Sequence, residues 1–237
     1  MPSFAKALTA FLLALLAGIA AADDCHPLPT PGLPQYLIGY GSLMQEASRL
    51  RTAPSAKEAW PVRVQGFRRA WIAQGAPVGL STTFLGVVSH PNSTMNAVLF
   101  PLASDAEIGN MDAREDGYCR VAVADKQVVM LNGQLPAIGE MWIYANRPRR
   151  VATPSARFPI VQSYVDIFVG ACLALERQYQ LAGFAEECIS STHGWSKHWV
   201  NDRIYPRRPF IYQPDATAID TLLQRRLPAL FKAIRIE

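Results

Sequence analysis

Several patterns that identify common protein classes are absent from this 237-residue sequence. After residue 22 it contains no apolar run as long as the ~20 residues that a membrane-spanning helix needs. It also lacks the G-x-S-x-G elbow of serine esterases, and it shows no internal repeat. A membrane bundle, an esterase of that type and a repeat array are therefore not expected.

Metal ligands in a familiar arrangement are also missing. His193 and His198 lie near Cys188 and Asp202 in the sequence, but the spacing matches no common zinc pattern. The sequence therefore predicts a protein without a metal site, and we expect no cofactor.

Charge gives little indication of a partner. The chain has 23 lysines and arginines against 19 aspartates and glutamates, a formal net charge of +4. Short arginine clusters occur at residues 147–150, 207–208 and 225–226, without the aromatic and basic interleaving of nucleic-acid-binding motifs. We interpret them as solvated surface and expect no nucleic-acid partner.

Residues 1–22 have the three parts of a signal peptide. Lys6 is their only charged side chain, residues 7–21 form a run of small and apolar residues, and the run closes in three alanines. The run is too short for a spanning anchor, and Cys25 is not placed for lipid attachment because Ala22-Asp23-Asp24 precedes it. We expect cleavage near Ala22, export to the periplasm or medium, and no stable membrane association afterwards.

Export permits disulfides, and all four cysteines lie after the leader. Cys172 and Cys188 flank Gly183 between two helical stretches, so we expect one bridge there, and the pairing of Cys25 and Cys119 stays open. Cys119 lies four residues after Glu115, which raises the alternative of a thiol nucleophile. No histidine is near it in sequence, and strand alternation can direct it into the core.

The most informative stretch is residues 111–120, Met-Asp-Ala-Arg-Glu-Asp-Gly-Tyr-Cys-Arg. Upstream, a Ser-x-x-Glu capping pattern and apolar residues three apart predict a short helix that Gly117 ends. From Tyr118 the alternating pattern and β-branched residues indicate a strand. Glu115 therefore lies at a helix–strand junction, where its carboxylate can face a cavity.

A second stretch, residues 36–43, reads Tyr-Leu-Ile-Gly-Tyr-Gly-Ser-Leu. An apolar strand running into this loop, with helix-compatible residues after it, predicts a strand–loop–helix corner. Free backbone N–H groups at such a corner can hold an anion such as a carboxylate. Taken alone, the pattern is more often an ordinary glycine turn.

The two stretches together resemble the γ-glutamylcyclotransferase superfamily, in which Tyr-Gly-Ser-Leu comes early and Asp-Ala-Arg-Glu-x-Gly-Tyr lies in mid-chain. The likeness spans roughly residues 36–209, and further parts of it are Gly66-Phe67-Arg68, Gly86-Val87-Val88, residues 140–144, a helix after Pro159 and residues 199–203. Residues 201–203 fit either a salt-bridged turn or a substrate clamp.

The resemblance implies the roles of the site residues. In that family the Tyr-Gly-Ser loop binds the γ-glutamyl moiety, and one glutamate after the short central helix is the acid and base. Glu115 takes the catalytic role here, and the loop residues are Tyr40, Gly41, Ser42 and Leu43. Two tyrosines, Tyr118 and Tyr144, are further candidates for hydrogen bonds to the substrate.

We expect an α+β fold, a γ-glutamylcyclotransferase-like curled mixed sheet or barrel with flanking helices. Turn signals such as Pro91-Asn92 separate the strands that we predict at residues 35–39, 62–73, 83–90, 95–102, 118–124, 127–131 and 138–144.

The C-terminal part is expected to be helical. A helical stripe begins at Ile160, with Gly183 as its stop, and Asp215 caps a final helix that Pro228 ends or kinks. Residues 23–34 are expected to be an extended lead-in and residues 35–237 a single domain.

The resemblance implies a metal-independent enzyme that converts a small γ-glutamyl substrate to 5-oxoproline and an amine or amino acid. Two alternatives stay open: a non-catalytic binding protein on the same fold, and an envelope hydrolase or amidotransferase acting on γ-linked glutamate. Members of the superfamily are mostly cytoplasmic, so a leader points to a substrate outside the cytoplasm. The sequence does not choose the substrate or the oligomeric state.

Overall fold

The computed structural model describes residues 25–76, 81–208 and 214–237. The predicted leader at residues 1–22 lies outside the described residues. In the described part, no helix is long and apolar enough to cross a membrane.

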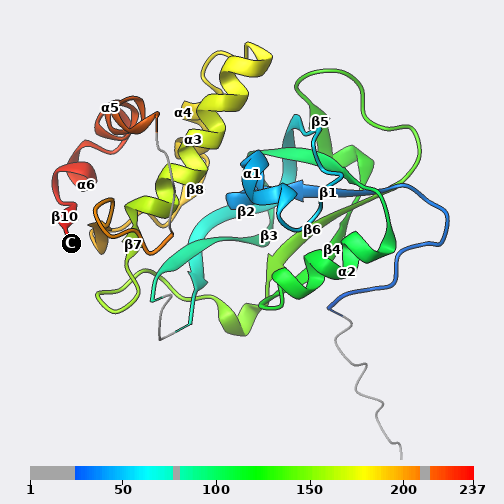
Figure 1. Cartoon of the computed structure of the whole chain (residues 1–237), viewed down its shortest axis with the longest axis horizontal. Coiled ribbons are helices and arrows are strands. Elements are labelled where there is room, and N and C mark those ends of the chain that lie inside the picture. The colour runs from blue at the N-terminus through cyan, green and yellow to red at the C-terminus, as the bar shows by residue number, and fades with distance from the viewer. Residues whose placement is uncertain (1–24, 77–80, 209–213) are drawn as a thin grey trace, which may run out of the picture.

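A mixed β-sheet forms the centre of the molecule (Figure 1). Its strand order is β4-β6-β1-β3-β2-β5, with β8 beside β2. β1 pairs antiparallel with β3 and parallel with β6. In the described residues the sheet has seven strands: β1 (Gln35–Gly39), β2 (Trp60–Gln74), β3 (Thr83–Leu102), β4 (Tyr118–Val123), β5 (Val128–Met130), β6 (Glu140–Asn146) and β8 (Thr192–His193).

The sheet curls because its two edges are joined by one short turn. β4 and β5 lie at opposite ends of the strand order, yet only the 3-10 turn η2 (Asp125–Gln127) separates them in the chain. Val123 of β4 and Val128 of β5 belong to the same buried cluster as Ile38 and Ile143 from the middle strands. The inner face of the curl is therefore a core of its own, and the predicted α+β class with a curled mixed sheet is confirmed.

The predicted turn at Pro91-Asn92 is wrong, because β3 is one strand from Thr83 to Leu102. Its pairing with β2 skips from Ser89↔Phe67 to Thr94↔Gln65, so residues 90–93 bulge opposite Gly66, which has a φ of 85°. A bulge leaves residues out of the ladder, where the missing N–H of a proline costs no hydrogen bond. A turn signal in the sequence therefore marks a bulge here.

Helices cover the sheet on two sides (Figure 1). The predicted helical C-terminal part is present, and α3 to α6 lie together on one side of the molecule. The helices are α1 (Glu46–Leu50), α2 (Asp105–Arg114), α3 (Gln162–Tyr179), α4 (Phe184–Ser190), α5 (Ala216–Arg226) and α6 (Pro228–Lys232), with 3-10 turns η1 (Ser42–Met44) and η3 (Pro148–Arg150).

The helix predicted after Asp215 is confirmed, because α5 begins at Ala216 with Asp215 at the N-cap position and ends at Arg226, before Pro228. The stop predicted at Gly183 is wrong. α3 ends at Tyr179 with Gln180 in the left-handed region (φ 54°), and Gly183 instead precedes α4 as its N-cap. Asp215 precedes α5 without a side-chain capping bond, since its carboxylate binds Arg177 (3.0 and 3.1 Å). Pro228 begins α6, where the missing proline N–H is not needed.

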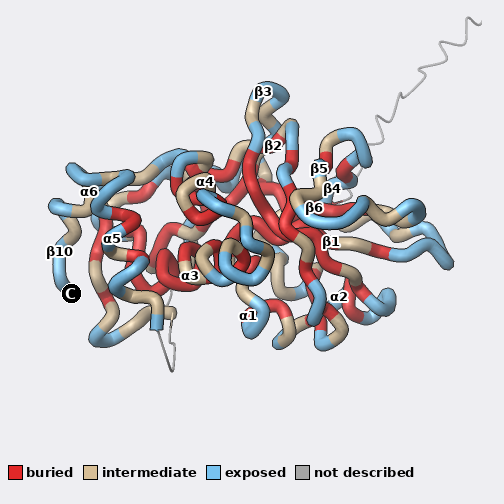
Figure 2. The backbone as a smooth tube through the Cα atoms, turned by 90° about the horizontal axis from the view of Figure 1, so that it is seen from above, coloured by how far each residue is buried: buried red, intermediate tan, exposed pale blue. Residues whose placement is uncertain are grey.

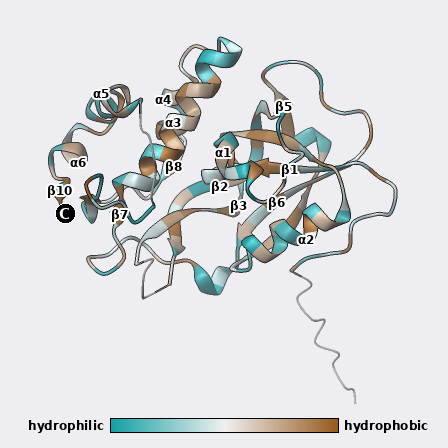
Figure 3. Cartoon of the chain, viewed as in Figure 1, coloured by the Kyte–Doolittle hydropathy of each residue, from teal (hydrophilic) through white to brown (hydrophobic). Residues whose placement is uncertain are grey.

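A larger core joins the sheet to the helices. It includes Leu37 of β1, Trp142 of β6, Phe168 of α3 and Leu223 of α5. Figure 2 shows buried residues along the centre of the molecule, and Figure 3 shows hydrophobic stretches on the central strands and more hydrophilic residues along α2. A small parallel sheet packs on the helical side: β7 (Ile160–Val161), β9 (Trp199–Asn201) and β10 (Arg235–Ile236).

Candidate active site

α2 brings Glu115 to the junction between helix and sheet. The Ser104 Oγ accepts a hydrogen bond from the Glu107 N–H (3.3 Å), as the Ser-x-x-Glu pattern predicts. The Glu107 carboxylate does not complete a capping box, because it accepts from the N–H groups of Ser55 and Ala103 (3.0 and 2.7 Å). These bonds tie the start of α2 to a neighbouring loop, so the far end of the helix, where Glu115 lies, is fixed as well.

A tight turn then joins α2 to β4. The Glu115 N–H donates to the Met111 carbonyl, and the Tyr118 N–H donates to the Glu115 carbonyl, both at 2.9 Å. β4 begins at Tyr118. Glu115 and Tyr118 therefore lie next to one another at the helix–strand junction.

The loop after β1 lies directly in front of this junction. A Cβ atom on Gly39 would lie 2.8 Å from the Leu43 Cβ, and one on Gly41 would lie 2.8 Å from the Tyr164 hydroxyl. The Tyr40 hydroxyl donates to the Tyr144 carbonyl (2.7 Å), which ties the loop to β6. A larger residue at either glycine would therefore require the loop or the neighbouring side chain to shift.

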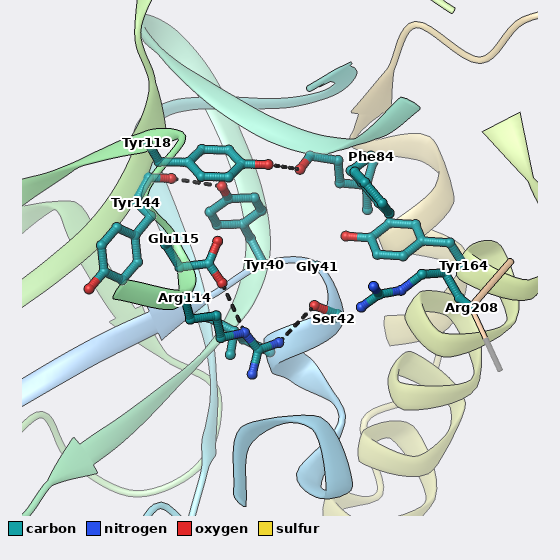
Figure 4. Close-up of a pocket in the computed structure, with 12 residues that line it drawn as sticks. Tyr40, Gly41, Ser42, Phe84, Arg114, Glu115, Tyr118, Tyr144, Tyr164 and Arg208 are labelled. Carbon is teal, nitrogen blue, oxygen red and sulfur yellow. Dashed lines mark hydrogen bonds and ion pairs between the residues drawn. The ribbon is translucent and has the colours of Figure 1, made fainter. Parts of the chain in front are cut away.

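A cavity of about 270 Å³ lies between the loop, the junction and α3 (Figure 4). It is lined by all seven residues singled out from the sequence: Tyr40, Gly41, Ser42, Leu43, Glu115, Tyr118 and Tyr144. Five further residues line it that the sequence did not indicate: Phe84, Leu85, Arg114, Tyr164 and Arg208. Two motifs that are about 70 residues apart in the chain thus contribute to the same cavity.

Arg114 forms an ion pair with Glu115, with 3.2 Å between Arg114 Nε and Glu115 Oε1. Its other nitrogens donate to the Ser48 carbonyl (2.7 Å), the Thr52 Oγ1 (3.1 Å) and the Ser42 Oγ (3.3 Å). Burial raises the pKa of the Glu115 carboxyl above its ordinary value, and the Arg114 charge partly opposes that rise. The carboxylate is therefore fixed in direction and more basic than a solvated glutamate.

The tyrosines of the cavity are neutral hydrogen-bonding groups. Burial raises the pKa values of Tyr40, Tyr118 and Tyr164, so each keeps its hydroxyl proton at neutral pH. The Tyr118 hydroxyl is 3.5 Å from the Leu85 carbonyl, at the long limit of a hydrogen bond.

Tyr144 differs from the other tyrosines, because its hydroxyl donates to Asp112 Oδ1 (2.6 Å). Figure 4 shows that hydroxyl directed away from Glu115. Tyr144 therefore contributes its ring to the wall, and its hydroxyl is engaged elsewhere.

Both cysteine pairs are bridged. Cys172 pairs with Cys188, as predicted, and Cys25 pairs with Cys119, which the sequence had left open. Cys119 therefore carries no free thiol in this structure, and the thiol-nucleophile alternative has no support. The hypothesis of a metal site near His193 also has no support, because Cys188 is in a disulfide and Asp202 binds Ser163 and Arg207.

Residues 201–203 form a structural turn. Asp202 is buried and accepts from the backbone N–H and the hydroxyl of Ser163 at the start of α3, both at 2.7 Å. The Arg203 guanidinium pairs with Asp166 and Asp220, each at 2.8 Å. Of the two readings left open for this turn, these contacts favour the salt-bridged one.

For one arginine cluster, Arg207-Arg208, the interpretation as solvated surface is wrong. The Arg207 guanidinium donates to the Ser81 carbonyl (2.7 Å) and pairs with Glu237, and Arg208 lines the cavity. Both side chains are only partly exposed.

Solved structures of similar shape were found by comparison. A γ-glutamyl cyclotransferase has 14% sequence identity and a TM-score of 0.49, over 66% of this chain and 86% of that one. An uncharacterized protein from Homo sapiens has 15% identity and a TM-score of 0.48, over 66% of this chain and 86% of that one.

A γ-glutamyl cyclotransferase from yeast described as specific to glutathione has 12% identity and a TM-score of 0.41, over 68% of this chain and 98% of that one. No family model and no curated protein sequence matches the chain. These similarities concern the shape of the chain alone.

Proposed function

We propose that the chain is a metal-independent γ-glutamylcyclotransferase-type enzyme, which cyclises a γ-glutamyl substrate to 5-oxoproline and releases an amine or amino acid. The observation that supports this most is that the Glu115 carboxylate and the Tyr-Gly-Ser-Leu loop line the same cavity. Such a cavity suits a small substrate held between a base and a ring of donors.

The reaction uses the substrate's own amine as the nucleophile. The α-nitrogen forms a bond to the γ-carbonyl carbon, a five-membered ring closes, and the bond from that carbon to the departing nitrogen breaks. Well-oriented intramolecular attack reaches effective molarities of ~10⁵–10⁸ M, so the protein mainly folds the substrate and moves a proton.

Glu115 is the proposed carrier of that proton. The α-ammonium is mostly protonated near neutrality, so it must lose a proton before it attacks. The Glu115 carboxylate takes this proton and then gives it to the departing nitrogen, and the raised pKa of Glu115 suits it to both steps.

The cavity donors are proposed to hold the rest of the glutamyl moiety. Residues 40–43 would bind its α-carboxylate through backbone N–H groups, and the neutral hydroxyls of Tyr118 and Tyr164 would donate to its oxygens. Among the described residues, the hydrogen-bond contact of the Tyr118 hydroxyl is the long one to Leu85, which leaves this hydroxyl available to a ligand.

The proposal includes export of the mature chain, with residues 23–34 as a lead-in and residues 35–237 as one catalytic domain. Two disulfides support an oxidising compartment. A core shared by Leu37 of the sheet and Leu223 of α5 supports a single domain.

A substrate panel tests the reaction class. The purified chain is incubated with γ-glutamyl amino acids, γ-glutamyl amines and glutathione, and the products are identified by mass. Release of 5-oxoproline supports the proposal. Release of glutamate would assign the chain to the hydrolases or amidotransferases instead, and binding without any product would assign it to the binding proteins.

A further inference from the structure

Arg208 brings a positive charge to the cavity from outside the sheet. It follows β9 in the chain and lines the wall next to Phe84 and Tyr164, and its guanidinium carbon is 5.5 Å from the centre of the Phe84 ring. Figure 4 shows the guanidinium directed into the cavity from the side opposite Glu115.

This charge has no partner in the part of the chain that the structure describes. Among the described residues that line the cavity, Glu115 is the one carboxylate, and it pairs with Arg114. No described carboxylate forms an ion pair with Arg208. The lining therefore has one cation in excess, which favours an anionic group on the ligand near Arg208.

The backbone at Arg208 is anchored to a buried aspartate. Its N–H donates to the Ser163 Oγ (3.1 Å), and that hydroxyl donates to Asp202 (2.7 Å). The N–H of Arg207 donates to the same carboxylate (2.8 Å). Asp202 and Ser163 thus fix the point from which the Arg208 side chain enters the cavity, as a binding residue requires.

We propose that Arg208 binds the carboxylate of the departing group, so that the substrates are γ-glutamyl amino acids or peptides rather than γ-glutamyl amines. This rests on the proposed function, which puts the α-amino group at Glu115 and the α-carboxylate at residues 40–43. The departing amino acid then extends toward the opposite wall, where Arg208 lies. A guanidinium fits a carboxylate with two parallel hydrogen bonds.

Two ligands that differ by one carboxylate test the inference. γ-Glutamylalanine and γ-glutamylethylamine share the glutamyl part and the amide, and only the first has a carboxylate on its departing group. Turnover is measured in the wild-type chain, Arg208→Met and Arg208→Lys. Binding is measured by calorimetry in the same three proteins with Glu115→Gln added. This measurement does not depend on catalysis.

The expected loss is selective. For γ-glutamylalanine, Arg208→Met lowers kcat/KM and raises Kd by about 10- to 100-fold, which is the range for a charge-assisted hydrogen-bonding pair. For γ-glutamylethylamine, both quantities change by less than about twofold. Arg208→Lys gives an intermediate loss. Arg207→Met is the matched control. The Arg207 guanidinium binds Ser81 and Glu237, so in this variant the ratio of kcat/KM between the two ligands stays at the wild-type value.

Each outcome separates this inference from the proposed function. Equal losses for both ligands, or no loss for either, overturn the role of Arg208 even if 5-oxoproline is formed. Selective weakening of γ-glutamylalanine binding without turnover supports the carboxylate site and contradicts the cyclisation. Absence of both binding and turnover contradicts both.

Discussion

The Arg114 Nε atom lies 3.2 Å from Oε1 of Glu115, and the two side chains share one wall of the cavity. Burial raises the pKa of Glu115, and Arg114 is the largest influence that lowers it. The electrostatic state of the proposed base therefore depends on the balance between the two. A base acts in its ionised form, so this balance should be visible in the pH dependence of turnover.

Replacing Arg114 by methionine should shift the acidic limb of kcat/KM to higher pH. Without the cation the pKa of Glu115 rises further, so activity is lost at acidic pH and recovers as pH rises through the new pKa. The measurement is a profile from about pH 4 to about pH 9, with folding checked by circular dichroism. Arg51→Met, which removes an exposed arginine at the end of α1, is the control for net charge. An unshifted limb would contradict the coupling.

Gly41→Ala should impair the loop that faces the base. The added methyl would lie 2.8 Å from the Tyr164 hydroxyl, so the loop or the tyrosine must move. Because displacements of ~1 Å in a site can cost ~10²-fold, we expect kcat/KM to fall by at least about 10-fold. Gly109→Ala is the control, since its methyl meets nothing within 4 Å and lies on the exposed side of α2. Full activity of the Gly41 variant would show that the loop tolerates the displacement.

Asp202→Ala should destabilise the fold and the position of Arg208 together. The substitution removes the carboxylate that accepts from two buried donors of Ser163, its backbone N–H and its hydroxyl, and from the N–H of Arg207. We expect the free energy of unfolding to fall by about 3 kcal/mol, measured by denaturant titration. Asp215→Ala, which removes only a surface pair with Arg177, should cost below about 1 kcal/mol. Similar losses in the two variants would contradict the anchoring role.

Removing the Cys172–Cys188 bridge should lower stability even though the chain between the two cysteines is short. The cysteines are 16 residues apart and fully buried between α3 and α4. A crosslink of that span contributes about 3 kcal/mol by restricting the unfolded chain. Cys172→Ala/Cys188→Ala should therefore unfold at a lower denaturant concentration than the oxidised wild type. A midpoint equal to that of the wild type would mean that the bridge adds nothing.

Much of the fold could be predicted from local patterns in the sequence. β1 begins and ends where its apolar run predicts, and α2 begins directly after Ser104, the first residue of the Ser-x-x-Glu pattern, because both signals act over a few neighbouring residues. The turn predicted at Pro91-Asn92 was wrong for the opposite reason. A bulge opposite Gly66 depends on pairing with another strand, which no local pattern records.

The same distinction holds for the candidate site. Glu115 and the loop of residues 40–43 could be found from two compact motifs. Phe84, Tyr164 and Arg208 could not, because they come from β3, from α3 and from the segment after β9, which only tertiary packing brings together at the cavity. Arg207-Arg208 looks like a surface pair in the sequence, and only the contacts to Ser163 and Ser81 show otherwise.

A glutamine at position 115 is the most informative variant, and its fold should be intact. A buried carboxyl with a raised pKa contributes stability below its unfolded pKa and loses it as pH rises through its folded pKa. At neutral pH the neutral glutamine should thus be at least as stable as the glutamate. Thermal unfolding measured at neutral and at acidic pH checks this, with the difference disappearing at the acidic end.

The most direct test is the amount of 5-oxoproline formed by the wild-type chain and by Glu115→Gln from the same γ-glutamyl substrate, measured by mass at neutral pH. The account predicts product from the wild type and, because glutamine cannot accept the proton, a loss of at least about 10³-fold in the folded variant. A folded Glu115→Gln variant that forms 5-oxoproline at the wild-type rate would contradict Glu115 as the base.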